Sequence, residues 1–375
     1  MKVKHILASI SRTLLGLVFV FSGFVKAIDP LGTVYKIEDY LKAFGGFFTD
    51  LLPLAEVAAV ILITVEFVLG VMMLCNIRTN WTSWLALAFY AVMTPLTLYI
   101  ALTNPVSDCG CFGDAIVLSN WATFWKNIVL TALVIVLLCT KSALRQTFTN
   151  IAEVGITCIA ILFVVIWQEV TYRHLPAIDF RPYKVGNNIP TLMEVPEDAE
   201  PDVYDIKLIY AKDGVEQEFT LQDYPKGDST WTFVDQKSVL VKKGYEAPIH
   251  DFEIMTMDFD DITYDILESE EPQTLVIIYD IAKMDKKQID KVGFIIHEQS
   301  NVHILTGSGE EDIVALAEEL GWDEETTWGT FCYTDPVTLK TIVRANPGVI
   351  VVQNGTIIDK YNMRQINKHV KQFND

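Results

Sequence analysis

The chain has 375 residues, 51% of them hydrophobic, and a net charge of −19. Nearly all of that charge lies in residues 175–375, which hold 18 basic and 38 acidic side chains, whereas residues 1–174 are close to neutral. An acidic C-terminal half of this kind excludes nucleic acid and an anionic membrane surface as its partners. The six cysteines do not form the disulfide framework of a small secreted domain.

Five apolar stretches in the N-terminal half have the length of about 20 residues that an α-helix needs to cross a bilayer. They cover residues 10–28, 52–74, 81–102, 122–139 and 151–170. The first is interpreted as an uncleaved signal anchor, because no small-x-small cleavage site precedes Asp29-Pro30. The sequence therefore predicts a membrane helical bundle over residues 1–174.

The basic residues of this half predict its orientation, because cytoplasmic loops carry an excess of Lys and Arg. They precede or open span one and lie between spans two and three and between spans four and five: Lys2, Lys4, Arg12, Arg78, Lys141 and Arg145. Residues 103–121 contain none. We therefore expect a cytoplasmic N-terminus in a bacterial inner membrane and a periplasmic C-terminal half.

Span two carries two carboxylates, Glu56 near its outer end and Glu66 deeper in the apolar run. Their spacing of ten residues is about 280° around a helix, so they do not share a face. An acid inside a membrane is costly and usually faces the bundle interior. Glu66 is interpreted either as a proton-handling or quinone-contacting group, or as a neutral acid in an interhelical hydrogen bond.

The segment between spans three and four contains C-G-C-F-G at residues 109–113. Cys109 and Cys111 can close a small disulfide ring, and Gly110 lowers the steric cost. So small a ring is strained and easily reduced, which favours a redox-active pair, but a static disulfide or turn is equally compatible. Metal binding is a weaker third interpretation, because no histidine stands nearby.

The four other cysteines are expected to pack as small hydrophobic side chains. Cys75, Cys139 and Cys158 lie in or at the ends of the apolar spans. Cys332 is alone in the acidic half, and it is either a core residue or a partner thiol for Cys109 and Cys111.

Residues 12–26 (RTLLGLVFVFSGFVK), residues 66–70 and the C-G-C-F-G segment resemble the DoxX/MauE superfamily of small membrane proteins. The resemblance covers about the first 140 residues and implies a four-helix core. The C-G-C-F-G segment resembles the MauE branch, which is linked to disulfide and quinone-cofactor maturation. The wider superfamily includes subunits of quinone-linked oxidoreductases, so the resemblance favours a redox role with a quinone. The whole layout is similar to a DoxX-type protein of Bacteroidota.

The acidic half begins with a proline-containing linker at 175–202 and continues with a small β-rich segment at 203–245. In that segment, strands at 203–211 and 215–221 are joined across Lys212-Asp213-Gly214, which is a hairpin signal, and residues 231–241 add a further strand.

Residues 246–375 alternate between strands and helices. We expect strands at 274–279, 302–306 and 329–333, and helices at 285–299, 310–320 and 336–346. A hairpin of 349–353 and 356–361 follows through Asn354-Gly355, a type I′ turn signal, and a helix ends the chain. This order predicts a mixed α/β domain.

Residues 247–252 (APIHDF) and 346–355 (NPGVIVVQNG) resemble the peroxiredoxin/TlpA branch of the thioredoxin-like fold. The resemblance implies a cis peptide bond before Pro347. The chain departs from that family at residues 279–284 (YDIAKM), where a C-x-x-C motif would stand. This domain therefore lacks a dithiol of its own, and a docking role follows for it.

Two functions from different classes remain. The first is an integral membrane protein with a thiol–disulfide redox role through Cys109 and Cys111, with Glu66 handling protons, a quinone as electron acceptor and a periplasmic client. The second is a non-enzymatic envelope scaffold whose acidic domain docks a partner. A transporter ranks last, and hydrolases and nucleotide-dependent enzymes have no motif in this sequence.

Overall fold

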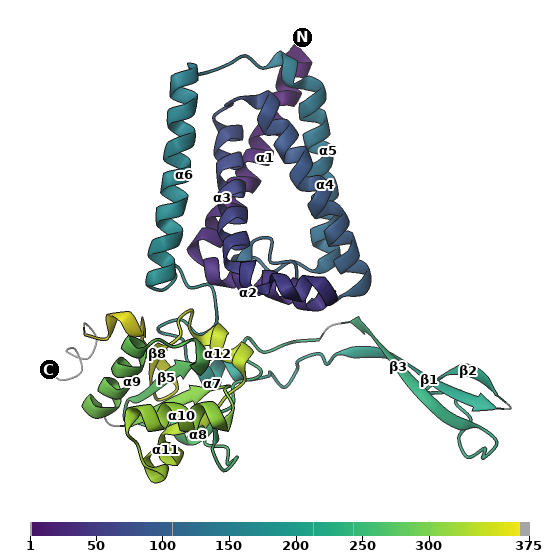
Figure 1. The fold of residues 1–375 in the computed structure, drawn as a ribbon. Helices are drawn as coiled ribbons and strands as arrows, with labels where there is room; N and C mark the ends of the chain where they lie inside the picture. Colours follow the sequence, from purple (N-terminus) through teal and green to yellow (C-terminus); the bar gives the residue numbers. More distant parts are fainter. Residues whose placement is uncertain (1, 107, 213, 243, 300, 368–375) are drawn as a thin grey trace.

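The computed structural model describes residues 2–106, 108–212, 214–242, 244–299 and 301–367. A helical bundle is followed by a C-terminal domain with β-sheets, and Figure 1 shows the two stacked end to end. The described helices include five that are long and apolar enough to cross a membrane. These are α1 (Lys2–Ile28), α3 (Ala55–Leu74), α4 (Thr79–Thr103), α5 (Asn120–Thr140) and α6 (Asn150–Arg173). The five predicted spans are thus confirmed.

Helix α1 is the centre of the bundle, since it contacts α3, α5 and α6. Its approach to α3 is close enough to require glycine. A Cβ added at Gly23 would lie 2.5 Å from the backbone nitrogen of Phe67, and one added at Gly70 would lie 2.4 Å from that of Val20. Small residues let membrane helices pack backbone to backbone, and this contact brings the polar side chains of α1 and α3 together.

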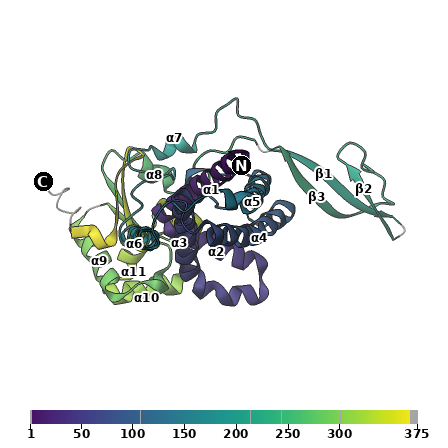
Figure 2. The same cartoon turned by 90° about the horizontal axis from the view of Figure 1, so that it is seen from above.

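Helix α2 (Pro30–Phe44) lies across the end of the bundle (Figures 1 and 2), where the sequence analysis expected a loop. Asp29 caps it, accepting a hydrogen bond from the backbone of Gly32, and Pro30 occupies its first turn. Val34 packs against Ala55 and Ala59 of α3. A 3₁₀ segment, Gly46–Leu54, then leads into α3.

The ends of the bundle differ in what they carry (Figure 1). One end of the bundle holds the N-terminus, the α3–α4 turn and the α5–α6 connection. Most of the basic residues from which the membrane orientation was predicted lie at this end. Helix α2 and the C-terminal domain lie at the other end. The grouping of connections agrees with the prediction, while the side of the membrane that each end faces stays a prediction.

The expectation that the span cysteines are buried is wrong for two of them. Cys139 and Cys158 are exposed on the outer faces of α5 and α6, and Cys75 is half-buried. An apolar side chain on the outside of a membrane bundle contacts lipid, so it needs no protein neighbour.

The C-terminal domain is built on a six-stranded mixed sheet of order β4-β7-β6-β5-β8-β9. The strands are β4 (Met255–Thr256), β5 (Gln273–Ile278), β6 (Val302–Thr306), β7 (Phe331–Tyr333), β8 (Gly348–Gln353) and β9 (Thr356–Asn362). Strand β6 runs parallel to β5 and β7, and the other pairs are antiparallel. Every residue of β5 is buried, as expected for a central strand covered on both faces.

Three helices lie near their predicted places, namely α9 (Lys286–Glu298), α10 (Glu310–Leu320) and α12 (Pro336–Ile342), although α12 ends before the expected residue 346. Two further helices, α8 (Thr263–Leu267) and α11 (Glu324–Thr330), were not predicted, and α11 covers the first two residues of the strand expected at 329–333. The terminal hairpin is confirmed, because Gln353 pairs with Thr356 and both Asn354 and Gly355 have positive φ, as a type I′ turn requires. The peptide bond before Pro347 is cis, as the resemblance implied. Residues 368–375 of the expected terminal helix lie outside the described residues.

The stretch expected as a linker, 175–202, is largely part of the domain. It contains a short helix, α7 (Ile189–Met193), and both Tyr183 and Ile189 are buried in the core. The backbone nitrogen of Ile189 donates to the carbonyl of Gly355 in the terminal hairpin. Its prolines therefore mark an irregular but packed segment.

A separate three-stranded antiparallel sheet, of order β2-β1-β3, projects from the body as an arm (Figures 1 and 2). Its strands are β1 (Val203–Lys212), β2 (Val215–Thr220) and β3 (Thr232–Lys242). Aromatic rings contact one another edge to face on this sheet, namely those of Tyr210, Phe219, Trp231 and Phe233. The expected small β-layer is present, and residue 213 of its predicted turn lies outside the described residues.

The glycine contact between α1 and α3 makes a testable prediction. Gly70→Leu is expected to destabilise the bundle by about 1–3 kcal/mol or more, because the added side chain meets backbone that cannot yield. The thermal unfolding temperature of the protein in detergent measures the effect. Gly155→Leu in α6 is the matched control, since a Cβ there meets no described atom within 4 Å. Equal unfolding temperatures for the two variants would contradict this account of the packing.

Candidate functional site

Cys109 and Cys111 lie side by side at the end of the bundle that faces the C-terminal domain. Both are free thiols, and their Sγ atoms are 2.9 Å apart. Closing a disulfide of about 2.05 Å requires only a small movement. Gly110 between them has a φ of 63°, which favours glycine, and a Cβ there would also touch the Lys36 side chain at 3.0 Å.

Side chains of α1 and α2 fix the backbone of this segment. The hydroxyl of Tyr40 donates to the carbonyl of Cys109 at 2.9 Å. Lys36 forms an ion pair of 2.7 Å with Asp108. The unpredicted helix α2 thus holds the beginning of the thiol segment.

A buried ion pair lies beneath the thiols. The Nζ atom of Lys26 is 2.8 and 2.7 Å from the two carboxylate oxygens of Glu66, and the two residues are only 4% and 2% exposed. The hydroxyl of Ser22 is 2.7 Å from Glu66 Oε2 and 2.7 Å from the carbonyl of Cys111. With one proton it donates to one of these oxygens at a time, so Ser22 links the ion pair to the thiol segment.

Glu66 faces the bundle interior, as the sequence predicted for an acid inside a membrane. Its side chain contacts Lys26 and Ser22 of α1, and both interpretations of its role stay predictions. Glu56 is exposed and contacts the hydroxyl of Tyr172, so the two acids indeed lie on different faces. The pairing of Lys26 with Glu66 was not predicted from the sequence, although a lone lysine in one apolar span and a lone deep acid in the next were a signal for it.

The two thiols differ in acidity. The hydrogen bond from Cys109 is the main cause that lowers the pKa of Cys111, to about 6, and the positive charges of Lys126 and Lys26 add to it against burial and Glu66. The same hydrogen bond, together with burial, raises the pKa of Cys109. Cys109 is buried and Cys111 is partly exposed. The reduced pair therefore holds one thiolate, on Cys111, and one thiol.

An apolar cavity of about 170 Å³ adjoins both thiols. Its apolar walls come from Val25, Ile37, Leu62, Met93, Leu96 and Phe180. Lys36 and Tyr40 also line it. An apolar cavity of about 150 Å³ is large enough to bind benzene, so this one has room for a single ring.

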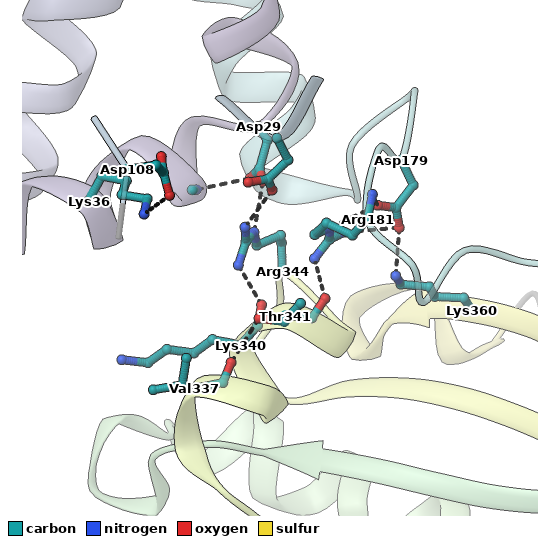
Figure 3. A network of polar contacts seen from close by, with 12 residues as sticks. Asp29, Lys36, Asp108, Asp179, Arg181, Val337, Lys340, Thr341, Arg344 and Lys360 are labelled. Atoms are coloured by element: carbon teal, nitrogen blue, oxygen red, sulfur yellow. Dashed lines mark hydrogen bonds and ion pairs between the residues drawn. The ribbon is translucent and has the colours of Figure 1, made fainter. Parts of the chain in front are cut away.

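The C-terminal domain is attached beside the thiol segment through a polar network (Figure 3). Arg344, just after α12, bonds Asp29 of the bundle and Asp114 of the thiol segment. Nearby, the carboxylate of Asp179 is bound by Arg181 and Lys360, which fastens residues 179–183 to β9.

The other candidate residues are not part of this site. Cys332 is 2% exposed in the sheet core, and burial raises its pKa to about 12, which supports the core interpretation over that of a partner thiol. Within the described ranges, no three His, Cys, Asp or Glu side chains are grouped as a metal site would require.

Residues 4–140 match the family model of methylamine utilisation protein MauE. Together with the five apolar helices, this match supports a MauE/DoxX-like membrane protein. The matched range contains α1 to α5, the thiol pair and the Lys26–Glu66 ion pair. Residues 204–243, which form the β-arm, match a domain of unknown function, DUF8463. The comparisons with curated proteins and with solved structures found no match.

The buried ion pair makes a second testable prediction. Glu66→Gln leaves the Lys26 charge without a partner and is expected to cost about 3–5 kcal/mol of stability. The double variant Lys26→Met/Glu66→Gln should recover much of that loss, because no charge remains buried. Unfolding in detergent measures both, with the exposed Glu56→Gln as a control expected to match wild type. A double variant less stable than Glu66→Gln alone would contradict this account.

The contact between the two thiols makes a third testable prediction. In the reduced protein, the rate of alkylation of Cys111 by iodoacetamide should rise with a midpoint near pH 6, well below the value of about 8.5 for an ordinary cysteine. Cys109→Ala removes the hydrogen bond and should move that midpoint upward. Peptide mass spectrometry over a pH series reads out both. A wild-type midpoint at the ordinary value would rule out the stabilised thiolate.

Proposed function

We propose that this protein is a membrane thiol–disulfide oxidoreductase component in which Cys109 and Cys111 cycle between dithiol and disulfide. The observation that carries the proposal is the contact between two free thiols of opposite pKa shift. A static staple needs no stabilised thiolate, whereas exchange depends on one.

The oxidised pair takes two electrons from a client dithiol. A client thiolate attacks the sulfur of Cys111, the more exposed of the two residues, breaking the Cys109–Cys111 bond and forming a mixed disulfide. Cys109 leaves and takes up a proton, which its raised pKa favours. The second client thiolate then displaces Cys111, a good leaving group because its pKa is low. The client leaves as a disulfide and the pair is reduced.

A quinone is the proposed electron acceptor that restores the disulfide. Dithiol and quinone give disulfide and hydroquinone, with two electrons and two protons transferred. The ring-sized apolar cavity against both thiols supports this choice. Glu66 is the proposed proton-handling group, since Ser22 lies within hydrogen-bond distance of its carboxylate and of the Cys111 carbonyl.

The protein is proposed to be a DoxX-type protein of Bacteroidota that lies in the bacterial inner membrane with its N-terminus in the cytoplasm. The thiols then face the periplasm, where disulfides form. The C-terminal domain is proposed to be thioredoxin-like, with residues 246–375 as its extent. The mixed order of its sheet supports this. Without a C-x-x-C, its role is to position the client.

The test uses the purified protein in lipid nanodiscs, with a reduced dithiol peptide and a water-soluble quinone. We expect one hydroquinone for each peptide disulfide formed. Cys109→Ser and Cys111→Ser should each abolish turnover, and Cys158→Ser, on the exposed face of α6, should leave it unchanged. Wild-type protein that transfers no electrons, or a Cys111→Ser variant that retains its turnover, would refute the proposal.

A second candidate function is a docking scaffold, which the β-arm specifically favours. The arm projects from the body (Figure 1). The Phe233 side chain of its aromatic group is exposed. If docking is the whole function, replacing residues 203–242 by a short flexible linker should abolish the cellular function while Cys109→Ser/Cys111→Ser leaves it intact. If the Cys109→Ser/Cys111→Ser variant loses the cellular function while the variant without the arm keeps it, the redox function is favoured.

A further inference from the structure

Arg344 is a buried contact between the C-terminal domain and the membrane bundle, and each of its three nitrogens has a partner (Figure 3). Nε lies 2.8 Å from Asp29 Oδ2, and Nη2 lies 3.0 Å from Asp114 Oδ2. Nη1 donates to the carbonyl of Lys340 at 2.6 Å, which fixes the guanidinium to its own domain. The planar fork of an arginine is suited to hold two carboxylates in this way.

This contact places one guanidinium against two carboxylates. Burial works to lower the pKa of Arg344, but the carboxylates of Asp29 and Asp114 outweigh it and raise that pKa. Burial likewise works to raise the pKa of Asp29, and the charges of Arg344 and Arg181 outweigh it and lower that pKa. Arg344 and Asp29 are largely out of water, so removing Arg344 takes a main positive charge away from a buried carboxylate.

The two carboxylates that Arg344 holds belong to the two supports of the thiol pair. Asp29 caps α2, the helix whose Tyr40 bonds the carbonyl of Cys109. Asp114 follows Cys111 by three residues. Arg344 therefore holds the far end of the thiol segment against the helix that holds its near end.

We infer that Arg344 is a positioning residue through which the C-terminal domain sets the reactivity of Cys109 and Cys111. The inference rests on the proposed redox function of that pair. With Arg344 in place, the thiols keep the contact that stabilises the Cys111 thiolate. When Arg344 is lost, Asp114 is released, the contact between the thiols loosens, and the Cys111 thiolate loses part of its stabilisation.

The test compares the alkylation midpoint of Cys111 in wild type, Arg344→Gln and Asp114→Asn. Both variants should move the midpoint upward by about one pH unit, which lowers the thiolate fraction of Cys111 at pH 7 from about nine-tenths to about one half. Arg344→Lys keeps the positive charge but cannot bond two carboxylates through a planar guanidinium, so it should shift the midpoint less than Arg344→Gln does. Arg364→Gln is the matched control, an exposed arginine of the same domain, and it should match wild type.

Attachment of the domain is measured separately, in a Cys109→Ser/Cys111→Ser background. The hydroxyls of Tyr35 and Tyr279 are 3.1 Å apart across the same interface, so Tyr35→Cys and Tyr279→Cys can be joined by a short bis-maleimide. Arg344→Gln should reduce the cross-linking yield. An unchanged Cys111 midpoint in Arg344→Gln overturns the inference, whether the cross-link is lost or retained. Because the midpoint needs no turnover, this outcome differs from failure of the quinone assay, which would overturn the proposed function.

Discussion

The Lys26–Glu66 ion pair is the interaction on which the membrane half depends. Two charges are buried between α1 and α3 at 2.7 Å, and glycines allow those helices to approach closely enough to bring them together. A polar pair of this kind is costly inside a membrane unless both charges are satisfied. Ser22 extends the pair to the carbonyl of Cys111, so the same polar centre supports the segment that carries the thiols.

The thiol segment is held from two sides, by the membrane bundle and by the C-terminal domain. Below it, α1 and α2 bond the carbonyls of Cys111 and Cys109. Beside it, Arg344 brings the C-terminal domain onto Asp114. The thiol contact and the adjoining apolar cavity thus lie where the bundle and the C-terminal domain meet. The domain has no C-x-x-C motif of its own, but through this contact it can influence the proposed chemistry of Cys109 and Cys111.

Much of this architecture could be predicted from the sequence, because long apolar runs and the Asn354-Gly355 turn are strong local signals. The pairing of Cys109 with Cys111 followed from their spacing. Helix α2 was missed although Asp29-Pro30 marks its start, since an amphipathic helix too short to span resembles a loop in a membrane protein. The roles of Lys26 and Arg344 could not be read locally, because their partners are 40 and 230 or more residues away in the chain. The packed linker was missed because prolines suggested flexibility while Tyr183 and Ile189 joined a distant core.

The most direct test of the account is the redox state of Cys109 and Cys111 in intact cells. Thiols are trapped by alkylation with a mass tag, with and without a mild reductant in the medium, and the modified protein is resolved by mass. The account predicts a mixed population of dithiol and disulfide that shifts readily toward dithiol when the reductant is added. A fully oxidised pair that resists reduction would contradict it, and would identify the segment as a structural staple.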